Sequence, residues 1–291
     1  MTRIVLLGAS GFIGKSLLPK LISEKFDVTA MIHNSSIMNS SILQDDILNP
    51  EFLDSELNEN DIIVNLIGQY TNNDSNFIDL NIKGGLNLLN SCIKNNVKKI
   101  ILISTINVYG NSIEKSSTEN DELFPKTNYG LIKLLTEKLY EQFTKIYKID
   151  VTILRMSNLY GPNKKAGYIT HLIHSTIDTE KNLLAYNNGN QLRDVLYIDD
   201  AVDGIIKCIK TPLSGFNIFN ISSGSKYKIN EIIQEIESIS NQKLNITYSE
   251  DIPDEICIWA DNSKAKNILG FSPTVSLHKG LKTTIDHLKN I

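Results

Sequence analysis

A glycine-rich turn follows a short apolar run near the start of the chain. The run from Arg3 to Leu7 has the pattern of a buried strand, and Gly8, Gly11 and Gly14 follow it at three-residue steps. In such a turn the first glycine permits a tight bend, the second lets a diphosphate approach the backbone, and the third lets a helix pack closely on the sheet. The helix N-terminus then offers amide donors to the phosphates. The pattern predicts a βαβ unit that binds a dinucleotide.

Short β-rich runs alternate with longer helical patterns through the first half of the chain. Predicted strands cover residues 3–7, 28–32, 61–67, 99–104 and 151–155, and predicted helices start at the glycine turn and cover residues 77–95 and 128–147. Such alternation is typical of a parallel sheet with helices on both faces. After about Met156 the pattern is less regular. We therefore predict an α/β fold, a Rossmann-like doubly wound parallel sheet at 1–155 with a smaller mixed α/β substrate-binding lobe at 156–291, the two interleaved.

Composition argues against several other classes of protein. The 291 residues are 41% hydrophobic and 21% charged, as in ordinary globular proteins, and a net charge of −4 without a basic cluster disfavours nucleic acid and membrane partners. No apolar run approaches the roughly 18 residues of a membrane span, and three cysteines without CxxC spacing indicate neither disulfides nor zinc. His171 and His174 lack further ligands nearby, so no metal is expected. We expect a cytoplasmic protein.

Tyr129 and Lys133 stand four residues apart in the predicted helix at 128–147. Positions i and i+4 lie on one helix face, so the lysine charge can favour the tyrosinate and lower a phenol pKa that is ordinarily about 10. Any long helix can carry this pair by chance. Its place downstream of a dinucleotide turn suggests hydride chemistry on a bound nicotinamide.

The residues that follow the second predicted strand indicate whether the dinucleotide carries a 2′-phosphate, as NADP does and NAD does not. NAD-binding proteins carry an acidic residue there for the ribose hydroxyl, but this chain has His33, Asn34 and Ser35. These side chains can donate hydrogen bonds to a 2′-phosphate, which favours NADP over NAD. An exposed polar loop without a cofactor role is the alternative interpretation.

Several motifs in a fixed order resemble those of one enzyme family. The glycine turn, Ser104-Thr105, and Tyr129 with Lys133 resemble the extended short-chain dehydrogenase/reductase family, in its nucleotide-sugar epimerase/dehydratase branch. The resemblance runs nearly end to end. Residues 154–162 and 189–200 resemble the two segments that flank a sugar-nucleotide site, and residues 259–271 resemble the branch's C-terminal segment.

The resemblance implies a role for individual residues. Tyr129 would be the acid/base at the sugar oxygen, Lys133 would hold the nicotinamide ribose, and Thr105 would orient the sugar oxygen. The implied cofactor-binding residues are Gly8, Ser10, Gly11, Phe12, Ile13, Gly14, His33, Asp46, Ile47, Leu66, Ile67, Gly68, Asn81, Ser104, Tyr129 and Lys133. The implied substrate-binding residues are Thr105, Asn158 and Arg193. Structural alternatives are a turn-capping Thr105, a helix-capping Asn158 and a surface Arg193.

The resemblance leaves three possible functions and disfavours a fourth, dehydration. Dehydratases of this branch carry an Asp-Glu pair after the active-site threonine, whereas this chain has Ile106 and Asn107, which disfavours water elimination. The leading expectation is an NADP-dependent reductase of a 4-keto-6-deoxy-sugar nucleotide. A nucleotide-sugar 4-epimerase with tightly bound NAD is the alternative, and a non-enzymatic NADP-sensing protein is a third. The resemblance also implies a homodimer, formed through the helices at 77–95 and 128–147.

Overall fold

A parallel sheet forms the centre of the molecule. The computed structural model describes residues 2–33, 41–68, 75–112, 114–178, 180–252 and 257–290. Within these ranges seven strands pair in parallel in the order β11-β6-β5-β4-β1-β2-β3. Their bounds are β1 (Arg3–Leu7), β2 (Asp27–Ile32), β3 (Ser41–Gln44), β4 (Ile62–Asn65), β5 (Lys99–Thr105), β6 (Asp150–Met156) and β11 (Phe216–Ile221). The strand order reverses between β1 and β4, which confirms the predicted doubly wound fold and places the ligand crevice at the carboxyl ends of these strands.

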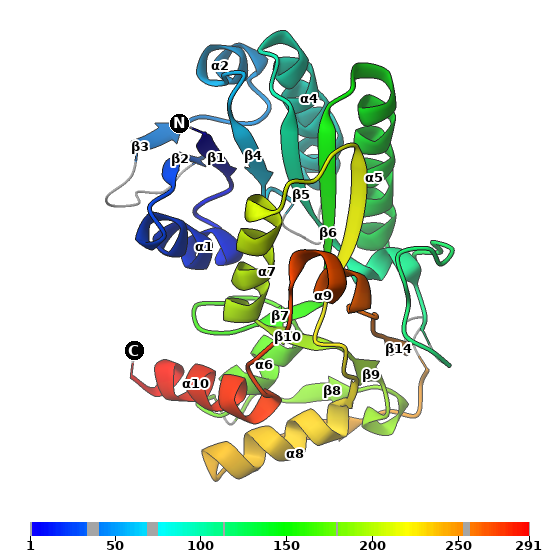
Figure 1. Ribbon diagram of the computed structural model, residues 1–291. Coiled ribbons are helices and arrows are strands. Elements are labelled where there is room, and N and C mark those ends of the chain that lie inside the picture. Colours follow the sequence, from blue (N-terminus) through cyan, green and yellow to red (C-terminus); the bar gives the residue numbers. More distant parts are fainter. Residues whose placement is uncertain are drawn as a thin grey trace.

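Helices cover both faces of this sheet (Figure 1). One face carries α1 (Phe12–Ser23) and α7 (Ile198–Lys210), and the other carries α2 (Pro50–Glu56), α4 (Gly84–Lys94) and α5 (Asn128–Tyr147). Because side chains alternate along a strand, Ile4 and Leu6 of β1 belong to the first core and Val5 and Leu7 to the second. Burial on both faces explains why the strands are apolar throughout.

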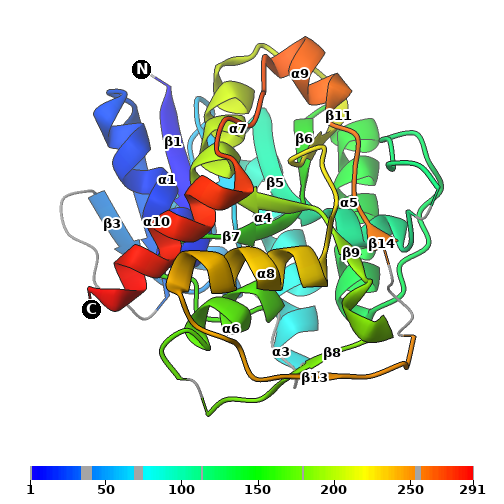
Figure 2. The ribbon, with the colours of Figure 1, turned by 90° about the horizontal axis from the view of Figure 1, so that it is seen from below.

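The second lobe lies beyond the carboxyl ends of the central strands, with α8 and α10 crossing it (Figure 2). Its helices are α6 (Tyr168–His174), α8 (Ile229–Ser240) and α10 (Leu277–Lys289), whereas α9 (Ser263–Leu269) packs on β11 and α7 of the main sheet. Its strands are β7 (Asn158–Tyr160), β8 (Leu183–Ala185), β9 (Leu192–Arg193), β10 (Val195–Tyr197), β12 (Tyr227–Lys228), β13 (Ile246–Tyr248) and β14 (Cys257–Ile258). Because β11 pairs with β6, the main sheet also includes residues beyond 155.

The region predicted as one helix at 77–95 has three parts. A short helix α3 (Ser75–Ile78) leads into a π-helical turn η1 (Asp79–Lys83), and α4 follows directly. The extra residue of a π turn shifts the side chains around the helix axis, and such turns are frequent at functional sites. This turn holds Asn81, one of the expected cofactor residues. The sequence analysis also missed β3 and α2, both of which are short.

Two further helical turns are η2 (Ile106–Tyr109), directly after β5, and η3 (Asn187–Gly189). No helix in the described ranges has both the length and the apolar character needed to cross a membrane.

Candidate active site

The glycine turn joins β1 to α1 with the geometry that a dinucleotide requires. Gly8 has a φ of +80°, and the Gly11 amide donates to the Gly8 carbonyl at 3.0 Å. A Cβ on Gly14 would lie 2.5 Å from the Ala9 carbonyl oxygen, so a side chain there would push the helix off the turn. Gly11 is the N-cap of α1 and no side chain caps this end. Its first-turn amides, those of Phe12 and Ile13 included, are therefore available to an anion.

Lys133 occupies a niche where three elements converge. Its buried ammonium donates to the carbonyls of Ile103 on β5 and Ile67 after β4, at 3.3 and 3.5 Å. Gly68 has a φ of +140°, and a Cβ there would lie 2.1 Å from Lys133 Nζ and 2.8 Å from Asn81 Oδ1. The structure thus brings together four of the expected cofactor residues: Ile67, Gly68, Asn81 and Lys133.

Only one of the two polar atoms of the Asn81 side-chain amide forms a hydrogen bond within the described residues. Its Nδ2 donates to the Phe77 carbonyl at 2.8 Å, while Oδ1 is buried and accepts no hydrogen bond from any described residue. An orphaned buried acceptor is costly, so such a group usually serves a ligand. Together with the glycine cradle at Gly68, this acceptor fits a nicotinamide dinucleotide that passes over the ends of β1 and β4.

Tyr129 lies in the first turn of α5, next to Thr105 at the end of β5. Thr127 caps the helix by accepting from the Gly130 amide at 3.2 Å, and the Tyr129 ring stacks on Phe77 with centroids 5.7 Å apart. Burial raises the pKa of Tyr129 to about 12. A hydrogen bond with the Thr105 side chain acts in the opposite direction but is the smaller effect. The expected acid/base residue and its partner are therefore in contact.

The pKa shifts differ from the sequence-based expectation for the Tyr129–Lys133 pair. Burial is the main influence on the phenol pKa, and the Lys133 ammonium donates to two backbone carbonyls. Burial lowers the pKa of Lys133 itself to about 8, and the Glu137 carboxylate opposes that decrease. In this geometry desolvation outweighs the mutual influence of the pair.

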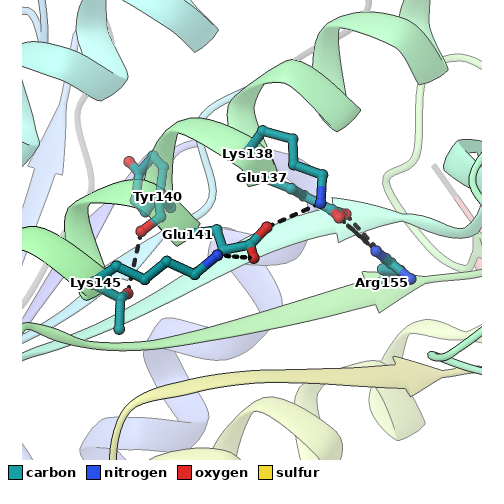
Figure 3. A network of polar contacts seen from close by, with 7 residues as sticks. Glu137, Lys138, Tyr140, Glu141, Lys145 and Arg155 are labelled. Atoms are coloured by element: carbon teal, nitrogen blue, oxygen red, sulfur yellow. Dashed lines mark hydrogen bonds and ion pairs between the residues drawn. The ribbon is translucent and has the colours of Figure 1, made fainter.

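A buried polar network lies behind the catalytic helix, and sequence reasoning missed it (Figure 3). Glu137, four residues after Lys133, pairs with Arg155 of β6 at 2.7 Å, and both side chains are at most 3% exposed. Arg155 also donates to the Tyr109 hydroxyl at 2.8 Å. The Ser104 hydroxyl donates to Glu137, so this side chain serves the network, whereas a cofactor contact was expected. The i+4 spacing of Glu137 from Lys133 was the available signal.

A carboxylate lies close to the end of β2. His33 Nε2 lies 3.5 Å from Asp46 Oδ2, beyond the end of β3. No carboxylate follows β2 directly in sequence, but the segment after β3 brings one near it in space. Asn34 and Ser35 lie outside the described residues. Ile47 is buried under α4, where a Cβ on Gly84 would lie 2.7 Å from its Cγ2.

Asn158 and Arg193 meet around one turn of the second lobe. The Asn158 amide group donates to the Asp194 carbonyl at 3.0 Å, and one Arg193 nitrogen donates to the Leu192 carbonyl at 2.9 Å. Asp194 is fully buried and accepts from the Ser223 amide and hydroxyl at 3.0 and 2.7 Å. Burial raises the pKa of Asp194 to about 6. Both expected substrate residues are half-buried on elements that this aspartate holds in place.

The thiols in the structure are structural in character. Cys92, Cys208 and Cys257 are buried and free, and burial raises the pKa of each. In the described ranges, no three His, Cys, Asp or Glu side chains gather in a way that could hold a metal ion.

Comparisons with known proteins agree with this geometry. Residues 4–222 match the model of the NAD dependent epimerase/dehydratase family. An uncharacterised UDP-glucose epimerase of Bacillus subtilis (strain 168) is 32% identical over 212 residues, which cover 72% of this chain and 67% of the relative. The crystal structure of UDP-glucose 4-epimerase from Thermotoga maritima with UDP-glucose superposes with a TM-score of 0.90 at 27% identity, covering 99% of both chains.

A second solved structure adds the cofactor. UDP-glucuronic acid 4-epimerase from Bacillus cereus, in complex with UDP-glucuronic acid and NAD, superposes with a TM-score of 0.88 at 29% identity, again over 99% of both chains. The resemblance to a nucleotide-sugar branch is thereby confirmed. This chain belongs to the NAD-dependent epimerase/dehydratase family, within the extended short-chain dehydrogenases/reductases.

Proposed function

We propose that this protein is a 4-epimerase of a UDP-linked hexose or hexuronate that works with retained NAD. The observation that carries the proposal is similarity over 99% of the chain to two 4-epimerases whose structures hold UDP-sugars. The contact between Tyr129 and Thr105 and the niche around Lys133 support it. The 4-keto-sugar reductase, which the sequence alone favoured, has no counterpart among these relatives.

Tyr129 carries the acid/base step. As a phenolate it takes the proton of the sugar's 4-hydroxyl while hydride leaves C4, which yields a 4-keto sugar. The 4-keto sugar then rotates in the site. The phenol returns the proton to the oxygen as hydride reaches the opposite face of C4. When bound, NAD accepts and returns this hydride, and its positively charged oxidised ring favours the phenolate. Protons and electrons balance over the cycle, so no net oxidant is consumed.

The residues around Tyr129 set its position. Thr105, hydrogen-bonded to Tyr129, places a hydroxyl beside the reacting oxygen, and the stack on Phe77 holds the ring. Lys133 and the free Asn81 Oδ1 supply a donor and an acceptor next to Gly68, where the nicotinamide riboside would pass. A fixed array of this kind lowers the barrier by orientation.

The residues after Thr105 argue against elimination chemistry. A dehydratase needs an acid and a base at this point, but Ile106 is fully buried and apolar. Asn107 accepts a hydrogen bond from Thr105 at 3.2 Å and has no ionisable proton at neutral pH. The site therefore supports oxidation and reduction at C4 without loss of water.

NAD is the cofactor that fits the end of β2. Asp46 lies beside His33 at the place where a ribose hydroxyl would be recognised, and a carboxylate there is compatible with a hydroxyl and not with a phosphate dianion. The bound NAD in the Bacillus cereus structure supports the same choice. We therefore propose NAD in place of the NADP expected from sequence.

The test is incubation of the purified protein with UDP-glucose, UDP-galactose and the two UDP-hexuronates, without added cofactor. We expect interconversion of one C4-epimeric pair, followed by chromatography and NMR, with no net change in absorbance at 340 nm. Retained NAD, released by denaturation and quantified, should accompany the activity.

Two outcomes would contradict the proposal. Stoichiometric consumption of NADPH with a UDP- or dTDP-linked 4-keto-6-deoxy sugar, without epimerisation, would restore the reductase. Cofactor binding without turnover of any nucleotide sugar would favour the non-enzymatic sensor.

A further inference from the structure

Lys164 is a cation that the proposed mechanism does not use. It lies in the loop between β7 and α6, in the second lobe, where its amide donates to the Gly161 carbonyl at 3.4 Å. Its ammonium lies over the Phe12 ring, 4.9 Å from the ring centroid. Phe12 is the first residue of α1, directly after the Gly11 N-cap. The second lobe thus extends a lysine over the start of the glycine-turn helix.

The surroundings of Lys164 lack a compensating negative charge. Burial lowers the pKa of Lys164 to about 8. Its side chain forms no ion pair within the described ranges, whereas most other lysines placed on aromatic rings here are exposed. The cation–π contact with Phe12 compensates only in part for the hydration that the ammonium loses on burial.

The Lys164 ammonium lies close to a second source of positive potential. The N-terminus of α1 carries the partial positive charge of the helix dipole and has uncapped amides. Two sources of positive potential therefore face the same region from different lobes. Such an arrangement is unfavourable by itself and becomes favourable when an anion lies between the two sources.

We propose that Lys164 binds the diphosphate of NAD from the second lobe, opposite the amides of the α1 N-terminus. The lysine thereby ties cofactor binding to the position of the second lobe on the sheet. The proposal rests on the use of NAD set out above and not on the epimerase reaction, so it applies to any chemistry at this site.

The sugar nucleotide carries a diphosphate as well. The position of Lys164 relative to the two binding regions indicates which diphosphate it contacts. Lys164 contacts the first residue of α1, the helix whose turn receives the dinucleotide. Asn158 and Arg193, the expected substrate residues, lie instead around Asp194. The observations therefore favour the cofactor diphosphate, and the alternative becomes an outcome of the test.

The test measures binding of NAD, ADP-ribose and UDP by calorimetry, on protein freed of bound nucleotide. Lys164→Met keeps the apolar stem over Phe12 and removes the charge, so a purely packing role would leave all three affinities unchanged. We expect the Kd for NAD and for ADP-ribose to rise about tenfold or more, since a hydrogen bond to a charged group contributes about 1.5–3 kcal/mol. The Kd for UDP should not change.

Two matched variants complete the experiment. Lys165→Met removes an exposed neighbouring charge and should leave NAD affinity unchanged, while Lys164→Arg keeps the charge and should restore most of it. Unchanged binding of NAD and ADP-ribose by Lys164→Met would overturn the proposal. A selective loss of UDP affinity would overturn it too, since it would assign the lysine to the sugar nucleotide. Absence of epimerase activity in the natural protein, together with the expected loss of NAD affinity in Lys164→Met, would contradict the proposed reaction and support the role of Lys164.

Discussion

Arg155 of β6 and Glu137 of α5 form a buried ion pair, with Nη2 2.7 Å from Oε2 and a second nitrogen, Nε, 3.1 and 3.2 Å from the two carboxylate oxygens. The same carboxylate accepts from Ser104 and acts on the pKa of Lys133, one helical turn away. The pair therefore joins the catalytic helix to two adjacent strands, directly behind the site.

The Glu137→Gln variant should unfold more easily than the natural protein. It leaves Arg155 buried without a counter-charge, and breaking a buried pair in this way costs about 3–5 kcal/mol. Denaturant unfolding followed by circular dichroism measures the loss. Glu141→Gln is the control, because Glu141 pairs with the exposed lysines Lys138 and Lys145 (Figure 3), where about 1 kcal/mol or less is expected. Equal losses in the two variants would contradict a special role for the buried pair.

Tyr129→Phe should retain NAD and lose turnover. Removing a positioned acid/base lowers kcat by about 100-fold to 10,000-fold, while the ring keeps its stack on Phe77. Tyr147→Phe, at the exposed end of the same helix, should behave like the natural protein. Turnover is measured at saturating UDP-sugar, and bound NAD is quantified after denaturation. Full turnover by Tyr129→Phe with normal cofactor content would remove Tyr129 from the mechanism.

The activity should fall as pH rises through about 8. Lys133 has its pKa lowered to about 8 by burial, so its ammonium, which is proposed to hold the cofactor, is present below that pH and is lost above it. The measurement is kcat from pH 6.5 to 9.5 at saturating NAD, which keeps Lys164 from contributing through cofactor affinity.

Stability should respond to Lys133 in the opposite sense. Its pKa is about 8 in the folded protein and 10.5 when unperturbed, so the unfolded chain binds more protons between these values. The contribution of this group to the free energy of unfolding therefore rises with pH over that window. Lys133→Met should remove both the alkaline decrease in kcat and this increase in stability. A decrease in kcat that persists in Lys133→Met would assign it to another group.

NAD should bind more tightly than NADP, and Asp46 should be the cause. Asp46→Asn removes the carboxylate beside His33 but keeps an acceptor for the Leu48 amide, so the turn should survive. We expect the preference for NAD to shrink about tenfold, as judged by the two dissociation constants. Tighter binding of NADP by the natural protein would show that His33 decides the preference.

The protein should form a homodimer through α4 and α5. Leu86 on α4 and Leu131 and Leu135 on α5 are 40–48% exposed, although apolar side chains of this size are usually covered. Leu135→Lys should convert the dimer to a monomer in light scattering after size exclusion. Ile268→Lys, at an equally exposed site on α9, should leave the mass unchanged. A monomeric mass for the natural protein would refute this expectation.

Local patterns were sufficient to predict much of the first half of the chain. The strand at 3–7 and the helix at 128–147 have the predicted bounds, because the strand is continuously apolar and the helix has a regular period of buried positions after a capping Thr127. Short elements such as β3 and α2 offer too few residues for a period to show. The π turn around Asn81 was not predictable either, since it depends on how the helix packs against its neighbours.

In the candidate site, too, some features were predictable from local sequence and others depend on packing. The glycine turn, Tyr129, Lys133 and Thr105 were predicted because their chemistry depends on spacing within one element or on residue types that few other roles require. The contact of Lys164 with Phe12 and that of Asp46 with His33 were not predicted, because each joins elements that are not adjacent in sequence.

The sequence by itself determined the class of fold and the family, and it supplied the candidate residues of the proposed catalytic centre, because strand alternation, a glycine turn and an i+4 pair are properties of neighbouring residues. Only the tertiary structure decided what surrounds Lys133 and Tyr129. Burial shifts both pKa values, Glu137 and Arg155 compensate each other from different elements, and Asp46 reaches His33 across two strands. Desolvation and Coulomb interactions depend on distances through space, and those distances are set when the lobes and layers pack.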